Sequence, residues 1–138
     1  MLHVLSGPNV ILVLKIAVLG VTCLFLSSLL ALWRGNFHLH GRINLVFFIL
    51  TASALIGLEV VARLIDPTLF DYFDSEPELR RALNTHLSFS IPSAVIMPLM
   101  LFTGFTHRRR IHLSLAMVFG LLWTGTFVTG IFYLPHRP

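Results

Sequence analysis

The sequence predicts an all-α integral membrane protein, a four-helix bundle that forms a single domain over residues 1–138. Hydrophobic residues make up 56% of the 138 residues and charged residues only 12%, which is far from the composition of a soluble domain. A soluble fold of this length buries roughly two-thirds of its unfolded surface, so one core cannot hide so many apolar side chains. The apolar residues form four long stretches without a period of two, which favours helices over β-barrel strands.

The four apolar stretches are the expected membrane spans, and each holds about the 20 residues that cross a hydrocarbon core of about 30 Å. They cover approximately residues 8–33, 43–65, 85–105 and 111–134. The first stretch lacks a basic leading segment and exceeds the usual signal-peptide core of about 7–15 residues, so we expect it to be retained. Pro92 and Pro98 should bend the third span. Gly120, Gly125 and Gly130 provide small surfaces for helix packing in the fourth.

The connection over residues 66–84 is the longest one, and we expect it to lie outside as a loop at the headgroup level. It carries five of the six carboxylates, together with the aromatic residues Phe70, Tyr72 and Phe73. Ser75 followed by Pro77 is typical of the start of a short helix, with Ser75 as its cap. The sequence gives no sign of an internal repeat.

Arginine placement predicts the orientation. Five arginines lie in or beside the first and third connections, against three on the other side: Arg34, Arg42, Arg108, Arg109 and Arg110 against Arg80, Arg81 and Arg137. Because short cytoplasmic loops carry an excess of basic residues, both termini and the loop 66–84 are predicted to lie outside.

Three charged residues fall inside the predicted spans, where a charge costs from roughly 2.5 kcal/mol upward. Lys15 lies near the outer end of the first span, and Glu59 and Arg63 lie near the outer end of the second. Glu59 and Arg63 are four residues apart and share a helix face, and we expect Lys15 to reach the same carboxylate. Two interpretations stay open: a self-neutralising cluster that fixes helix register, or a proton path or ligand contact.

The seven histidines fall into two layers. His38, His40, His107 and His112 accompany the first and third connections, whereas His3, His86 and His136 lie toward the outside. A helix over residues 86–107 is roughly 31 Å long at about 1.5 Å per residue, so a single metal would take ligands from one layer. His40 and His112 begin the second and fourth spans and are the best candidates for a shared site. Imidazoles from facing helices suit haem b and, less well here, copper. The alternative is interfacial histidines that bind headgroups, carbonyls or water.

Scattered polar positions carry a family resemblance across nearly the whole chain: Asn9, the His-Gly-Arg-Ile-Asn run at 40–44, His86, Pro98-Leu99, Arg110-Ile111-His112, and the Trp-Thr-Gly-Thr-Phe-Val-Thr-Gly run at 123–130. With these residues the chain resembles the CtaM-like family of small four-span bacterial membrane proteins, which is associated with haem–copper cytochrome oxidase assembly. The resemblance implies that His40, His86 and His112 occupy the family's recurring histidine positions. It also implies haem binding or a role in oxidase maturation. The acidic, aromatic loop and the His-Gly-Arg start of the second span depart from the family pattern.

The expected function is therefore that of a membrane-embedded accessory or assembly factor of a respiratory haem–copper oxidase in the bacterial inner membrane, holding b-type haem through its histidines. Its expected partners are the lipid bilayer and cytochrome oxidase subunits or another membrane complex, with no nucleic acid. No nucleophile–base pair or phosphate-binding loop is evident, so we do not expect an enzyme. The alternative is a non-catalytic structural subunit of a larger membrane complex that holds lipid and neighbouring helices. A small-ion or copper transporter would need polar residues through the middle of the membrane.

Overall fold

The computed structural model describes residues 6–134, so His3, His136 and Arg137 lie outside the described part of the chain. The helices are α1 (Gly7–Trp33), α2 (Phe37–Val60), α3 (Pro77–Phe105) and α4 (Arg109–Val128). The helices α2 and α4 continue into π-helical turns, η2 (Val61–Ile65) and η4 (Thr129–Tyr133), and η3 (Asp71–Asp74) is a short 3₁₀ helix. Residues 6–134 contain no strand, which confirms the all-α class.

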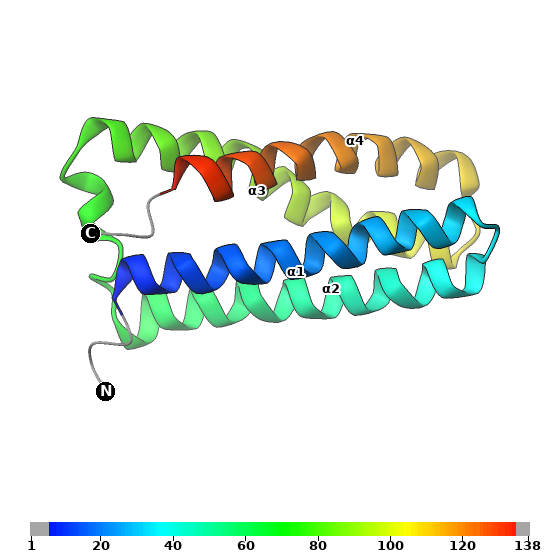
Figure 1. The fold of residues 1–138 in the computed structure, drawn as a ribbon, viewed down its shortest axis with the longest axis horizontal. Helices are drawn as coiled ribbons and strands as arrows, with labels where there is room; N and C mark the ends of the chain where they lie inside the picture. Colours follow the sequence, from blue (N-terminus) through cyan, green and yellow to red (C-terminus); the bar gives the residue numbers. More distant parts are fainter. Residues whose placement is uncertain (1–5, 135–138) are drawn as a thin grey trace.

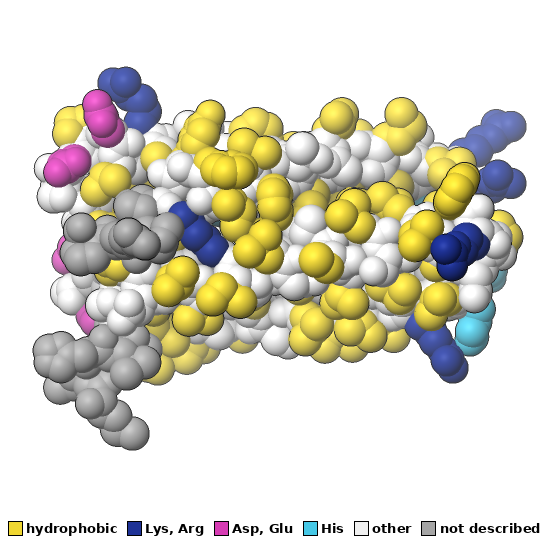
Figure 2. All heavy atoms as spheres, in the orientation of Figure 1, with side chains coloured by type: hydrophobic (Ala, Val, Ile, Leu, Met, Phe, Trp, Pro, Cys, Tyr) yellow, Lys and Arg dark blue, Asp and Glu magenta, His cyan; other side chains and the backbone are white. Residues whose placement is uncertain are grey.

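All four helices, taken with their π-helical turns, are long and apolar enough to cross a membrane. Their apolar side chains face outward along the length of the bundle (Figure 2). Val13 and Leu121, for example, are 64% and 76% exposed. Because an aqueous solvent would penalise so much exposed apolar surface, the fold is that of a multi-pass membrane protein.

The helices pair as two antiparallel hairpins, α1 with α2 and α3 with α4 (Figure 1). The hairpins lie side by side, with further contacts of α2 with α3 and of α1 with α4. Both short turns, at residues 34–36 and 106–108, lie at one end of the bundle, and the connection from α2 to α3 lies at the other (Figure 1).

The two hairpins repeat the same turn geometry with an offset of 72 residues, a repeat that we did not expect from the sequence. Asn36 N donates to Ala31 O at 2.9 Å, and Arg108 N donates to Thr103 O at 3.0 Å, with 108 − 36 = 103 − 31 = 72. The equivalent residues Gly35 and His107 both have positive φ, at 76° and 56°. Few side chains are identical at equivalent positions, so this turn shows the repeat mainly in its backbone hydrogen bonds.

The central core lies where the hairpins meet. Phe47 and Phe119 occupy equivalent positions, are 2% and 0% exposed, and contact each other edge to face with ring centroids 6.0 Å apart. Trp123 packs against both rings, and its Nε1 donates to Thr22 Oγ1 at 3.1 Å. Equivalent residues that meet in the middle indicate an approximate two-fold axis along the bundle, which exchanges the two hairpins.

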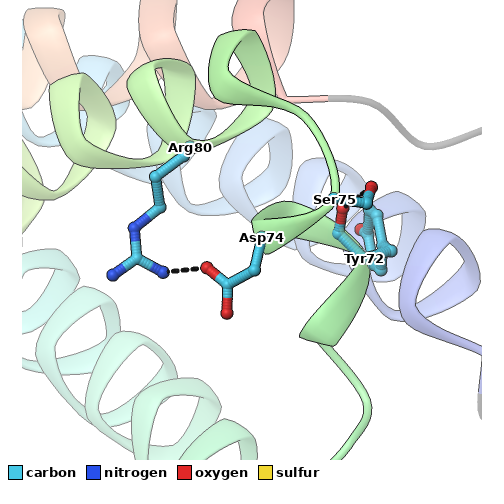
Figure 3. Close-up of polar contacts among 4 residues, drawn as sticks. All are labelled: Tyr72, Asp74, Ser75 and Arg80. Carbon is cyan, nitrogen blue, oxygen red and sulfur yellow. Dashed lines mark hydrogen bonds and ion pairs between the residues drawn. The ribbon is translucent and has the colours of Figure 1, made fainter.

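The connection from α2 to α3 is shorter than expected, because α3 begins at Pro77. Leu69 and Phe73 in this connection are buried. The expected short helix is therefore the first turn of α3, and the loop shrinks to residues 66–76. Ser75 does not cap this helix as expected, since its Oγ donates to Tyr72 O at 2.6 Å, and Asp74 pairs with Arg80 (Figure 3).

Charge is divided between the two ends of the bundle. We call the end with the two short turns the arginine end, because it carries Arg34, Arg42, Arg108, Arg109 and Arg110. We call the other end the acidic end, because it carries all six carboxylates, of Glu59 and of residues 66–78. On the face drawn in Figure 2, acidic side chains lie at the left end, and arginines project from the right end.

Candidate functional site: histidines between the helices

His40 joins α1 to α2 at the arginine end. Its Nδ1 lies 2.9 Å from Ser28 O and 2.8 Å from Ser28 Oγ. A carbonyl oxygen can only accept a hydrogen bond, so Nδ1 carries the proton and Nε2 carries the lone pair. Asn44 Nδ2 donates to that Nε2 at 3.1 Å, and Ser28 Oγ donates to Asn44 Oδ1. Every polar side-chain atom of His40, Ser28 and Asn44 thus has a partner, although Ser28 is fully buried.

His112 joins α3 to α4 in the same way. Its Nδ1 donates to Met100 O at 2.8 Å, which again fixes the proton on Nδ1. The ring packs on Gly104, where an added Cβ would lie 3.1 Å from His112 Cε1. Glycine at position 104 therefore allows the imidazole to approach the backbone of α3.

The two histidines are equivalent in the repeat, since 112 − 40 = 72 and their carbonyl acceptors also differ by 100 − 28 = 72. Each lies seven residues before its core phenylalanine, Phe47 or Phe119, and seven residues are about two turns on one helix face. His40 and His112 therefore lie on the helix faces that meet in the core, at the arginine end.

These hydrogen bonds decide which atom of each ring can take a ligand. Metal-binding histidines commonly donate the other ring N–H to a carbonyl, and both rings already have this arrangement. Asn44 occupies Nε2 of His40, whereas its equivalent, Ala116, offers nothing to His112. Asn44 entered the sequence prediction only as part of the run at 40–44, although it lies one helical turn after His40 and that spacing could have indicated their contact. Ser28 was not predicted.

His86 lies at the opposite end, toward the acidic end, so the structure separates it from His40 and His112. Its Nδ1 donates to Thr129 Oγ1 at 2.9 Å, and Thr129 Oγ1 in turn donates to Gly125 O. The ring packs on Gly130, where an added Cβ would lie 3.1 Å from His86 Cε1. His86 thus joins α3 to the end of α4.

The predicted charged cluster is divided in two. Lys15 is 9% exposed, and its Nζ donates to Ile131 O in η4 at 2.8 Å. Glu59 and Arg63 form an ion pair with each other on the exposed face of α2 and η2. Lys15 therefore binds the end of α4 rather than the carboxylate that we expected. A main-chain carbonyl has no sequence signature, so this partner could not have been predicted.

Lys15 and His86 also line one small cavity of about 50 Å³ between α1 and the end of α4, together with Gly130 and Ile131. Over residues 6–134, no group of three or more histidine, cysteine, aspartate or glutamate side chains is arranged to hold a metal ion.

Comparison with models of protein families, with curated proteins and with solved structures finds no match to this chain. The class of the protein therefore follows from its own fold and contacts. It is a four-span helical membrane protein whose internal polar side chains join one helix to another.

Proposed function

We propose that the protein is a membrane-embedded accessory or assembly factor of a respiratory haem–copper oxidase. In this proposal it resides in the bacterial inner membrane, with the arginine end in the cytoplasm and both termini outside. The observation that carries the proposal is the equivalence of His40 and His112, two imidazoles whose Nδ1 protons are both fixed by carbonyls. The resemblance to the CtaM-like family places recurring histidines at these same positions.

The donor set fits a b-type haem. His40 and His112 would hold the iron through their Nε2 atoms, and the bound group would supply reversible one-electron chemistry. The carbonyls of Ser28 and Met100 orient the rings. Asn44 must turn its amide away from Nε2 of His40 before that atom can bind a ligand. Copper is the less favoured ligand, because two imidazoles on separate helices match the axial pair of a haem.

The second candidate is a non-catalytic structural subunit that holds lipid and neighbouring helices. The hydrogen bonds themselves favour it, since the imidazoles of His40, His86 and His112 all join helices to each other. In this case the same contacts would serve stability alone, and the exposed apolar faces would receive lipid or a partner's helices.

An oxidised and reduced visible spectrum of the detergent-purified protein, with iron and copper analysis, separates the two candidates. We expect a stoichiometric b-type spectrum that is lost in both His40→Ala and His112→Ala and kept in His86→Ala. Loss in His86→Ala alone would move the site to the other end. A colourless, metal-free protein that folds normally would instead establish the structural candidate over the haem-binding one. Oxidase activity in membranes that lack the protein tests the assembly role separately.

A further inference from the structure

We propose that the groove between α1 and α2 at the arginine end binds one anionic phospholipid, with an acyl chain against its wall and the phosphate at Arg34. The groove has a volume of about 400 Å³, which lies within the range of about 300–1,000 Å³ for small-molecule sites. It is lined by Ser27, Leu30, Ala31, Arg34, Asn36, Leu39 and Ile43. This site does not depend on any cofactor.

The lining residues suit an amphipathic ligand. The wall is mainly apolar and runs along the last two turns of α1 and the first two turns of α2. The polar groups, Arg34 and Asn36, come from the turn at the end of the groove. A phospholipid has its polar and apolar parts in the same order, with a phosphate at the headgroup level and a hydrocarbon chain toward the membrane centre.

Charge complementarity identifies the headgroup. All six carboxylates of the chain lie toward the acidic end, and Arg34 forms no ion pair with any of residues 6–134. The counter-charge must therefore come from outside the chain. Guanidinium groups bind phosphate through paired hydrogen bonds, and anionic lipids supply phosphate at this depth.

Further donors lie at the same turn. Asn36 Oδ1 accepts a hydrogen bond from Leu39 N at 3.1 Å and so caps α2. This bond leaves the side-chain NH₂ of Asn36 available to donate. The N-terminus of α2 follows the same turn, and a helix N-terminus favours an anion.

The second hairpin provides an internal comparison. At the positions equivalent to Ser27, Leu30 and Arg34 it carries Leu99, Phe102 and Thr106. Leu99 and Phe102 put larger side chains on the wall, and the cation moves from the position of Arg34 to Arg108, the equivalent of Asn36. The first hairpin therefore differs from the second in having the smaller Ser27 and Leu30 on the wall and its arginine at position 34.

Trp33 supplies the reporter for a test, because it is 84% exposed and precedes Arg34. Trp123→Phe leaves it as the single tryptophan, since the chain has two. In mixed micelles, brominated phosphatidylglycerol should quench its fluorescence at a lower mole fraction than brominated phosphatidylcholine. We expect Arg34→Gln to reduce this preference about fivefold, equivalent to about 1 kcal/mol, whereas Arg108→Gln, with the same change of charge, should keep it.

A charge-preserving variant tests the wall. Ser27→Leu combined with Leu30→Phe installs the residues of the second hairpin and should abolish the preference although Arg34 remains. Native mass spectrometry of the unaltered chain should show one retained phosphatidylglycerol, independently of the Trp123→Phe background.

Three results would overturn the proposal. One is an equal effect of Arg34→Gln and Arg108→Gln, which would mean general attraction to the arginine end. Another is an unchanged preference in the folded double variant. The last is full displacement by inorganic phosphate, which would leave an anion site without a lipid.

Discussion

Two neighbouring serines allow a direct test of the interhelical hydrogen bonds. Ser28 is fully buried, and its Oγ bonds to Asn44 and His40 on α2. Ser27 is exposed, and its Oγ bonds to Cys23 O within its own helix. Ser28→Ala should therefore destabilise the bundle, and Ser27→Ala is the matched control.

The expected magnitude follows from the number of bonds. Interhelical hydrogen bonds in membrane proteins average about 0.6 kcal/mol and reach about 1.7 kcal/mol. Ser28→Ala removes two of them, so the free energy of unfolding should fall by about 1.2 kcal/mol. The bond from His40 Nδ1 to the backbone of residue 28 survives the substitution. The control should change the free energy by less than about 0.5 kcal/mol.

Reversible unfolding in mixed detergent micelles, followed by circular dichroism, measures both variants. A double-mutant cycle of Ser28→Ala with Asn44→Ala should give a coupling of about 0.6 kcal/mol, because the two side chains share one bond. Equal free energies for the Ser27→Ala and Ser28→Ala proteins would refute the reasoning, as would additive effects of the two substitutions in the cycle.

Two further predictions concern packing and pH. An added Cβ at Gly125 would overlap the Phe89 ring, so Gly125→Ala should lower the free energy of unfolding by about 1–3 kcal/mol. Gly20→Ala meets nothing within 4 Å and should not lower it in the same micelle assay. Burial raises the pKa of Tyr72 above 10.0, so its folded state holds the phenol proton more tightly. The resulting stability is complete below about pH 10 and is lost as pH rises through the raised pKa. Tyr72→Phe should remove this loss in an alkaline titration of unfolding; a titration identical to wild type would contradict it.

The same Tyr72→Phe variant should cost little at neutral pH. Tyr72 Oη is buried and has no hydrogen-bond partner among residues 6–134. Removing a buried hydroxyl that lacks a partner also removes its desolvation penalty. The free energy of unfolding of this variant at pH 7 should therefore equal that of wild type or be slightly higher. A clear decrease would indicate that the hydroxyl has a hydrogen-bond partner.

The sequence indicated that His40 and His112 lie at the span ends, but not what surrounds them. The positions of His40 and His112 at the starts of the second and fourth spans follow from hydropathy alone. Their acceptors are carbonyls of Ser28 and Met100, each 12 residues earlier on the preceding helix. Such backbone acceptors depend on how the turn brings two helices together, so no residue type in the sequence indicates them.

The division of the charged cluster has a similar cause. Glu59 and Arg63 pair because a helix places residues four apart on one face, and this spacing is visible in the sequence. Whether Lys15 reaches that pair depends on which neighbouring helix its side chain faces. Lys15 faces the end of α4, where Ile131 offers a carbonyl, whereas Glu59 and Arg63 lie on an exposed face of α2 and η2.

The sequence by itself determined the class of this protein, because span length and hydropathy are local properties that the bilayer thickness selects. It also determined the division of charge between the two ends, because this division follows from the order of the charged residues along the chain. Only the tertiary structure decided the 72-residue repeat, the meeting of Phe47 with Phe119 and the partners of each buried polar atom. These features depend on how helices far apart in the chain pack, and lipid-facing and helix-facing residues of a membrane span are similarly apolar, so hydropathy does not distinguish them.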